Sequence, residues 1–73
     1  MPRLPVISGD EFVDVMKGAG FERVWTRGSH MIIKNEIGIR LSVPRHKELD
    51  RGTLRGLIRT AGLSRDDFIE LRR

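Results

Sequence analysis

Two short turns, at Gly28-Ser29 and at 35–38, divide the middle of the sequence into three β-prone runs. The runs are rich in β-branched, aromatic or alternating apolar residues, and they cover positions 21–27, 30–34 and 39–43. Pro44 ends the third run, because proline has no N–H to donate to a sheet. Turns this short join only antiparallel strands, so the sequence predicts a three-stranded antiparallel sheet.

Helical patterns precede and follow this predicted sheet. Ser8 opens a capping box, and apolar residues then recur at helical spacing until a glycine-rich stop, which predicts a helix over about 9–19. Asp50 is a suitable N-cap for a second helix that stops at Gly62, and Ser64 is a suitable N-cap for a short final helix. The predicted order of elements is α-β-β-β-α with a short C-terminal helix.

Two amphipathic helices and one sheet fit a two-layer α+β sandwich, with the helices on one face of the three-stranded antiparallel sheet. At 73 residues the chain is expected to form one domain, 1–73, and packing alone must hold it because the sequence has no cysteine. No apolar run approaches the roughly 20 residues of a membrane span, and the first residues lack the apolar stretch of a signal peptide. We therefore expect a cytoplasmic protein with no membrane contact.

The basic residues are concentrated in the middle of the chain. Positions 23–59 carry nine Lys and Arg against three Asp and Glu, within a formal net charge of +4 for the whole sequence. Such a concentration is typical of proteins that bind a polyanion, most often nucleic acid, or an acidic protein partner. A solvated surface that only keeps the domain soluble is the alternative that charge alone leaves open.

One histidine falls on the predicted open face of the sheet. A second strand that turns Met31 and Ile33 toward the helices presents His30 on the opposite face, together with Lys34 and with Arg40 of the third strand. An imidazole can accept and return a proton near neutral pH, as cleavage of RNA through its 2′-hydroxyl requires, and nearby cations stabilise charge that builds on phosphorus. An ordinary surface histidine is the alternative that spacing alone leaves open.

Two further side chains allow two interpretations each. Trp25 would stack on a base or on a side chain of a protein partner, or else pack across strands. His46 lies in a basic loop, where it would either contact a phosphate or simply be solvated. Two histidines without cysteines and without i,i+4 spacing argue against a metal site. We expect neither a metal nor another cofactor.

Four short motifs follow one another along the chain, within GFERVWTRGSHMIIKN and LSVPRHKELDRGTLRGLIRTAGLSRDDFIEL. They are Gly20-Phe21, Gly28-Ser29-His30, Val43-Pro44 and Gly52-Thr53-Leu54. In this order and spacing the sequence resembles the HicA-like (YcfA-like) toxin family of bacterial and archaeal toxin–antitoxin pairs, and the likeness covers nearly the whole chain.

The resemblance implies a fold like a double-stranded RNA-binding domain and the activity of a ribosome-independent mRNA endonuclease. It also implies a HicB-type antitoxin partner, in a type II toxin–antitoxin system, that covers the active face of the toxin. The position that matches the family's catalytic histidine is His30. We expect it to act as general base on a 2′-hydroxyl without metal, in a toxin that is monomeric when free.

Polar and basic residues around His30 are expected to hold the RNA backbone. They are Arg27, Ser29, Lys34, Arg40, Arg45, His46, Lys47, Arg51 and Arg55. Gly28 is expected to supply a backbone conformation that a side chain would strain, Gly52 to permit close packing, and Thr53 to cap or bond locally. Two alternatives stay open, namely a non-catalytic RNA-binding module and a protein-interaction module with a basic face.

Overall fold

The computed structural model describes residues 3–73, so positions 1 and 2 of the predicted single domain lie outside the described residues. The described chain forms three helices and three strands, in the order α1 Gly9–Lys17, β1 Glu22–Arg27, β2 His30–Lys34, β3 Arg40–Pro44, α2 Arg51–Thr60 and α3 Arg65–Arg72. The strands lie in the order β1-β2-β3, and both pairs are antiparallel. The predicted α+β order is confirmed. Within the described residues, no helix has the length and the apolar character needed to cross a membrane.

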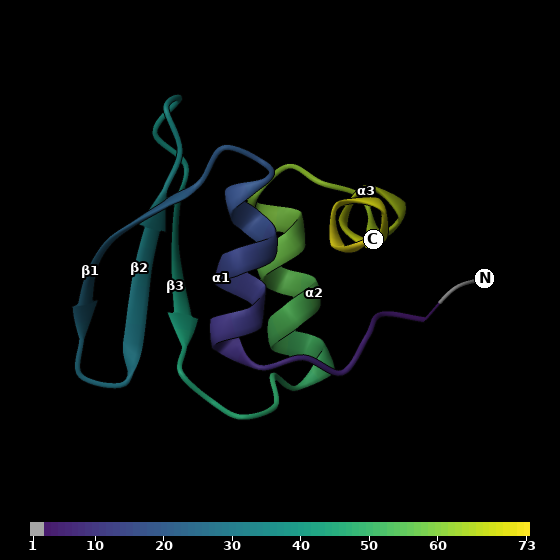
Figure 1. Cartoon of the computed structure of the whole chain (residues 1–73), viewed down its shortest axis with the longest axis horizontal. Coiled ribbons are helices and arrows are strands. Elements are labelled where there is room, and N and C mark those ends of the chain that lie inside the picture. The colour runs from purple at the N-terminus through teal and green to yellow at the C-terminus, as the bar shows by residue number, and fades with distance from the viewer. Residues whose placement is uncertain (1–2) are drawn as a thin grey trace.

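The helices leave one face of the sheet open. Figure 1 shows α1 and α2 along one face of the sheet, and α3 on the far side of these two helices. The ring of Phe68 in α3 stacks on the ring of Phe12 in α1, with 5.5 Å between their centroids. The sheet and the first two helices therefore form the predicted two layers, and α3 closes the helical layer from outside.

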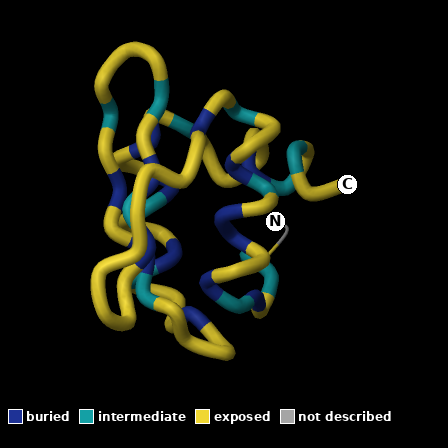
Figure 2. Tube along the Cα trace, turned by 60° about the vertical axis from the view of Figure 1, so that its left-hand side comes forward, coloured by how far each residue is buried: buried dark blue, intermediate teal, exposed yellow. Residues whose placement is uncertain are grey.

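The core lies between the sheet and the helices. Met31 and Ile33 of β2 are buried, as are Leu41 and Val43 of β3, and these side chains belong to one cluster that includes residues of all three helices. This alternation is the period-2 pattern predicted from the sequence. Figure 2 marks the buried positions in dark blue, and along β2 and β3 they alternate with exposed or half-buried ones. No polar or charged side chain between positions 3 and 73 is buried, so the core is held by apolar packing alone.

The observed boundaries differ slightly from those predicted. The first helix ends at Lys17 rather than near 19, because positions 18–20 form a turn in which Gly20 has a positive φ of 89°. The third strand begins at Arg40 and includes Pro44. Pro44 fits there because β3 is an edge strand, and an edge strand has no second neighbour to which its N–H groups would have to donate.

Gly9 allows α1 to begin in contact with the chain that leaves β3. Gly9 is buried, and its N–H donates to the carbonyl oxygen of His46 at 2.9 Å. A Cβ at this position would overlap the carbonyl oxygen of Pro44 and come within 3.3 Å of the Cα of Arg45. This glycine is needed for close approach of two backbones, a requirement that the capping pattern did not indicate.

We expect Gly9→Ala to lower the free energy of unfolding by about 1–3 kcal/mol, because the added methyl group must push the helix away from Pro44. The matched control is Gly56→Ala in α2, where a Cβ would meet no atom within 4 Å. The control should be more stable than the unmodified protein by roughly 0.5–1 kcal/mol. Urea denaturation followed by circular dichroism measures both changes. A Gly9→Ala protein as stable as the Gly56→Ala protein would contradict this interpretation.

Each helix begins with a carboxylate that makes a capping hydrogen bond. Bonds with the backbone and side chain of Ser8 lower the pKa of Glu11, and equivalent bonds with Ser64 lower the pKa of Asp67. Bonds from the side chain and backbone of Thr53 lower the pKa of Asp50. Because these pKa values are lower in the folded chain, the caps contribute stability above about pH 4 and lose it as the pH falls further.

Acidification should therefore destabilise the protein below about pH 4 through the three helix caps. A triple variant with Glu11→Gln, Asp50→Asn and Asp67→Asn should be less stable at pH 7, because a neutral amide is a weaker acceptor, and should lose less stability between pH 7 and pH 3. Urea midpoints at the two pH values measure this difference. An equal loss in the triple variant and the unmodified protein would show that other groups control the acid response.

Candidate nucleic-acid interface

The open face of the sheet carries the polar residues that the alternation predicted there. His30 and Lys34 of β2 are exposed, and so are Arg40 and Ser42 of β3. Ile32 lies between them and is half-buried. Because the buried neighbours of these residues face the helices, this set shares the solvent side of the sheet.

Strand β1 adds two more side chains to the open face. The register shifts between Arg23 and Trp25, so a bulge precedes the pairing of Trp25 with Ile32 and of Arg27 with His30. Side chains of paired residues lie on the same face of a sheet, which places Trp25 and Arg27 beside the β2 residues of the open face. All six residues of β1 are exposed, since this edge strand extends beyond the helical layer.

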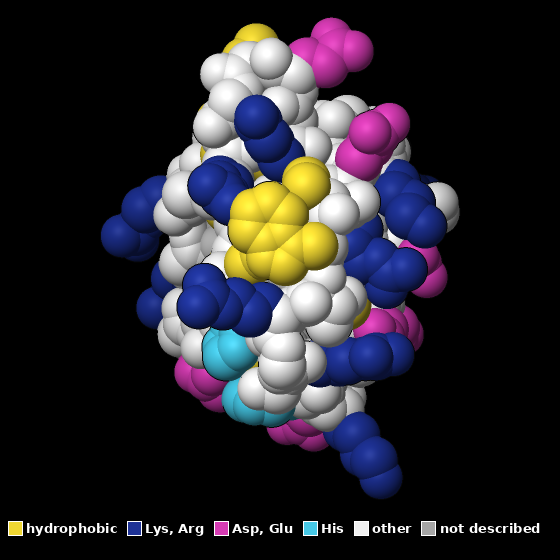
Figure 3. Space-filling view, turned by 90° about the vertical axis from the view of Figure 1, so that its left-hand side faces the viewer, with side chains coloured by type: hydrophobic (Ala, Val, Ile, Leu, Met, Phe, Trp, Pro, Cys, Tyr) yellow, Lys and Arg dark blue, Asp and Glu magenta, His cyan; other side chains and the backbone are white. Residues whose placement is uncertain are grey.

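Trp25 forms the centre of a small apolar patch on this face. Its side chain is 43% exposed, and the guanidinium carbon of Arg40 lies 4.7 Å from the ring centroid. That distance is typical of a cation–π contact. Figure 3 shows hydrophobic side chains in the middle of this face, with Lys and Arg around them and histidine toward the lower end. Trp25 therefore packs across strands, against Ile32 of β2 and Arg40 of β3, and still keeps exposed surface that could contact a further group.

His30 begins β2 immediately after the turn at Gly28-Ser29. Gly28 has a φ of 61°, as the first central residue of a type II′ hairpin turn requires, so its predicted role is confirmed. The hydroxyl oxygen of Ser29 lies 3.5 Å from Nδ1 of His30, at the outer limit of a hydrogen bond. Between positions 3 and 73, no three His, Cys, Asp or Glu side chains gather closely enough to hold a metal ion.

The loop after β3 is bonded to this hairpin. The N–H of Arg45 donates to the carbonyl oxygen of Ser29 at 2.7 Å, and the carbonyl oxygen of the next residue, His46, accepts from Gly9 at 2.9 Å. The Arg45 side chain also reaches Oδ1 of Asp10, with 3.5 Å between the atoms and both side chains more than half exposed. Backbone hydrogen bonds therefore hold Arg45 and His46 beside the turn that carries His30.

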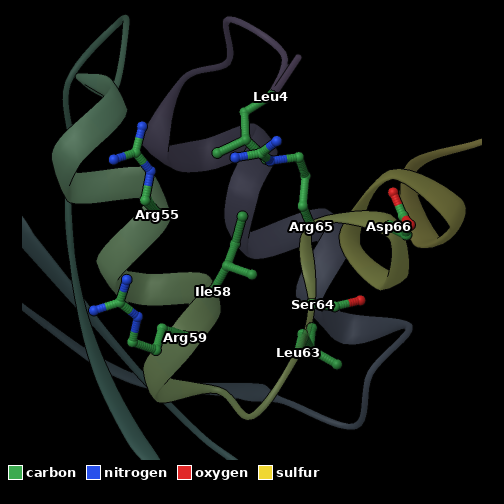
Figure 4. A pocket seen from close by; sticks show the side chains of 8 residues that line it. All are labelled: Leu4, Arg55, Ile58, Arg59, Leu63, Ser64, Arg65 and Asp66. Carbon is green, nitrogen blue, oxygen red and sulfur yellow. The ribbon is translucent and has the colours of Figure 1, made fainter. Parts of the chain in front are cut away.

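The remaining predicted RNA contacts lie farther along the chain. Lys47 is exposed in the same loop, and Arg51 is exposed at the start of α2. Arg55 lines a cleft of about 440 Å³ between α2 and the chain that enters α3, near Arg59 and Arg65. Figure 4 shows these arginines around the apolar side chains at the base of the cleft. The structure thus places Arg55 on the helical side of the molecule, away from the open face of the sheet.

Gly52 and Thr53 belong to the N-terminal cap of α2. The Thr53 hydroxyl donates to Oδ1 of Asp50 at 2.5 Å, and its N–H donates to Oδ2 at 3.2 Å, so the predicted capping role is confirmed. Gly52 is exposed, and an added Cβ would lie 3.3 Å from Oδ2 of Asp50. Apart from adjacent residues and the backbone of the helix itself, no other group of the described chain would lie within 4 Å of that Cβ. The one close neighbour of Gly52 is thus the capping carboxylate of Asp50, and within the described chain no distant backbone approaches this glycine.

Several cations of the open face are available to an anion. The ion pairs found between positions 3 and 73 join Lys17 to Asp14, Arg45 to Asp10 and Arg73 to Glu70. None of them involves Arg27, Lys34 or Arg40, and all three of these side chains are exposed. The sequence did not indicate the Asp10–Arg45 pair, because both residues were explained by local patterns.

Comparison with known proteins agrees with these features. A family model described as the HicA toxin of bacterial toxin–antitoxin matches residues 9–63. The match begins at α1, contains the hairpin of His30 and the cap of α2, and ends just before α3. A search of the curated proteins returned no match. Because the family model covers most of the chain, from its first helix to the end of α2, the protein belongs to the HicA toxin family of bacterial toxin–antitoxin systems.

Proposed function

We propose that this toxin is an endoribonuclease that cleaves mRNA with His30 as its general base. The observation that carries the proposal is the position of His30, exposed on the open face at the end of a hairpin and paired in register with Arg27. The proposal is also supported by membership in a family of RNA-cleaving toxins. The first argument comes from the geometry around one residue, and the second from the sequence as a whole.

The reaction uses a nucleophile that RNA itself supplies. The neutral imidazole of His30 takes the proton of a 2′-hydroxyl, and the oxygen then attacks the adjacent phosphorus. The bond from phosphorus to the 5′-oxygen breaks, which leaves a 2′,3′-cyclic phosphate and a free 5′-hydroxyl. An Nδ1–H that donates to the nearby hydroxyl of Ser29 would leave Nε2 as the basic nitrogen. Neither a metal nor another cofactor takes part in these steps.

The departing 5′-oxygen needs a proton donor. His46 and Lys47 are the candidates, because the loop that contains them is bonded to Ser29 through the N–H of Arg45. Arg27 and Arg40 would stabilise the charge that builds on the phosphate, while Lys34 would hold the chain farther along β2. Arg45 would contribute less than these residues, since Asp10 already neutralises part of its charge.

The partner of the toxin would be a HicB-type antitoxin that covers the open face. A surface rich in unpaired cations favours an acidic partner, and covering that surface would keep mRNA away from His30. The free toxin would be a monomer that acts on mRNA in the cytoplasm. Inhibition and substrate binding would then compete for the same residues.

Replacement of His30 tests the catalytic assignment. His30→Ala and His30→Gln should lower the rate of RNA cleavage in EDTA by roughly 10²- to 10⁴-fold, because the general base is lost. The affinity for RNA should change only a few-fold, since the cations remain. The matched control is Ile37→Ser, an 81% exposed position in the turn at the other end of β2, which should cleave normally. Rates are measured by gel electrophoresis of end-labelled RNA.

Cleavage by His30→Ala at the unmodified rate would contradict the assignment. Growth inhibition that survives His30→Ala but not the loss of basic residues would show that RNA binding alone is the toxic activity. Because both results come from the same set of variants, they distinguish the hypothesis of catalysis by His30 from the hypothesis of RNA binding alone.

The cations of the open face should account for the salt dependence of RNA binding. In a variant with Arg27→Gln and Lys34→Gln, the slope of log affinity against log salt should become shallower by about 1.4, because two phosphate contacts are lost. The matched control carries Arg59→Gln and Arg72→Gln on the helical side, with the same change in net charge. Fluorescence anisotropy with labelled single-stranded RNA measures both slopes. Equal changes in the two variants would mean that net charge, rather than this face, drives binding.

A further inference from the structure

We propose that Trp25, held by Arg40, is a stacking platform for one nucleobase beside the cleaved linkage. This platform would restrict the toxin to single-stranded RNA. The inference rests on the proposed function, since it names the form of RNA that the same face accepts. It concerns a residue to which the mechanism above gives no role.

The first observation is the exposure of the indole. A tryptophan side chain that is 43% exposed leaves a large apolar surface in water, in a small domain that buries its other large aromatic side chains. Its cross-strand neighbour Ile32 is half-buried and adds apolar surface beside the ring. An apolar surface of this kind, ringed by cations, suits a flat and uncharged group attached to a polyanion (Figure 3).

The second observation is the contact with Arg40. A guanidinium 4.7 Å from the ring centroid restrains the orientation of the indole without enclosing it, because Trp25 keeps its exposure. No ion pair found between positions 3 and 73 involves Arg40, so its donors are available to a phosphate. One pair of side chains can therefore contact both parts of a nucleotide, the base through the ring and the phosphate through the guanidinium.

The third observation is the position of the ring relative to His30. Trp25 pairs with Ile32, and His30 lies two residues away on the same strand and face, so Trp25 and His30 are diagonal neighbours. Diagonal neighbours in an antiparallel pair have Cα atoms about 7–8 Å apart, which aromatic side chains can span. Arg27, paired directly with His30, follows Trp25 on the same face. A base on Trp25 would thus belong to a nucleotide at the reacting linkage or next to it.

The chemistry at His30 explains why such a platform would be useful. Attack by the 2′-oxygen requires it to lie roughly in line with the departing 5′-oxygen. Bases paired and stacked in a duplex restrain the sugar and phosphate between them, and enzymes that need such a nucleotide displace it from the stack. Stacking one base on Trp25 would compensate for the lost base stacking and free the linkage to rotate. Every base has such a face, so the platform would show little sequence preference.

The protein contains one tryptophan and no tyrosine, so its intrinsic fluorescence reports on Trp25 alone. The experiment uses the His30→Ala protein, which should bind RNA without cleaving it, and a 12-nucleotide single-stranded RNA. At saturation, judged by anisotropy of a labelled RNA, the protein should lose most of its emission. Inorganic polyphosphate, which has charge but no bases, should leave the emission nearly unchanged. The same RNA annealed to its complement should quench much less.

Bound single-stranded RNA that leaves the emission unchanged would overturn the platform. If the unmodified toxin cleaves that RNA nevertheless, the proposed function stands and only the stacking fails. If the RNA neither binds nor is cleaved, the proposed function fails as well. Equal quenching by duplex and single-stranded RNA would overturn the restriction to single strands.

Substitution of the ring provides a second readout. Trp25→Leu keeps an apolar side chain but cannot stack, and it should raise the Kd for single-stranded RNA about 5- to 150-fold. Trp25→Phe is the matched variant, and it should recover most of this affinity because it retains a flat ring. Position 25 is exposed, and circular dichroism checks that each variant is folded. Equal affinities of the two variants would overturn the proposal and leave the ring as a contact for a protein partner.

Discussion

The double attachment of one short loop holds the candidate site together. Arg45 and His46 follow β3, and their backbone bonds on one side to Ser29 and on the other to Gly9. The second bond depends on Gly9, because any side chain there would collide with Pro44. The turn that carries His30 is therefore fixed relative to the start of α1 by main-chain atoms, without the additional ordering of long basic side chains.

The open basic face follows from the way the core is built. Helices α1 and α2 cover only one face of the sheet, and within the described chain the buried side chains are all apolar. Strand alternation then leaves the charged residues of β2 and β3 on the uncovered face. The bulge before Trp25 brings the outward residues of β1 into the same set. A small apolar core and a concentrated basic surface are thus two results of one arrangement.

The features predicted from sequence are those that near neighbours determine. Short turns, alternation and the caps at Ser8 and Asp50 are local, and each was found where it was predicted. Features set by distant contacts were missed, above all the approach of Pro44 to Gly9 and the contact of Arg40 with Trp25. For the candidate site, a local motif drew attention to His30. That the turn of His30 is bonded to the loop after β3, and that Arg55 lies on the helical side, away from His30, became visible only in the folded structure.

The central claim is that His30 activates the 2′-hydroxyl of the RNA as the nucleophile. The most direct test is an RNA that carries a single 2′-deoxynucleotide immediately 5′ of a bond that the toxin cleaves. The mechanism predicts that cleavage at this bond stops in EDTA while cleavage at other bonds and affinity for the RNA persist. Continued cleavage at the deoxy-substituted bond would contradict the claim, because water or a protein group would then have to be the nucleophile.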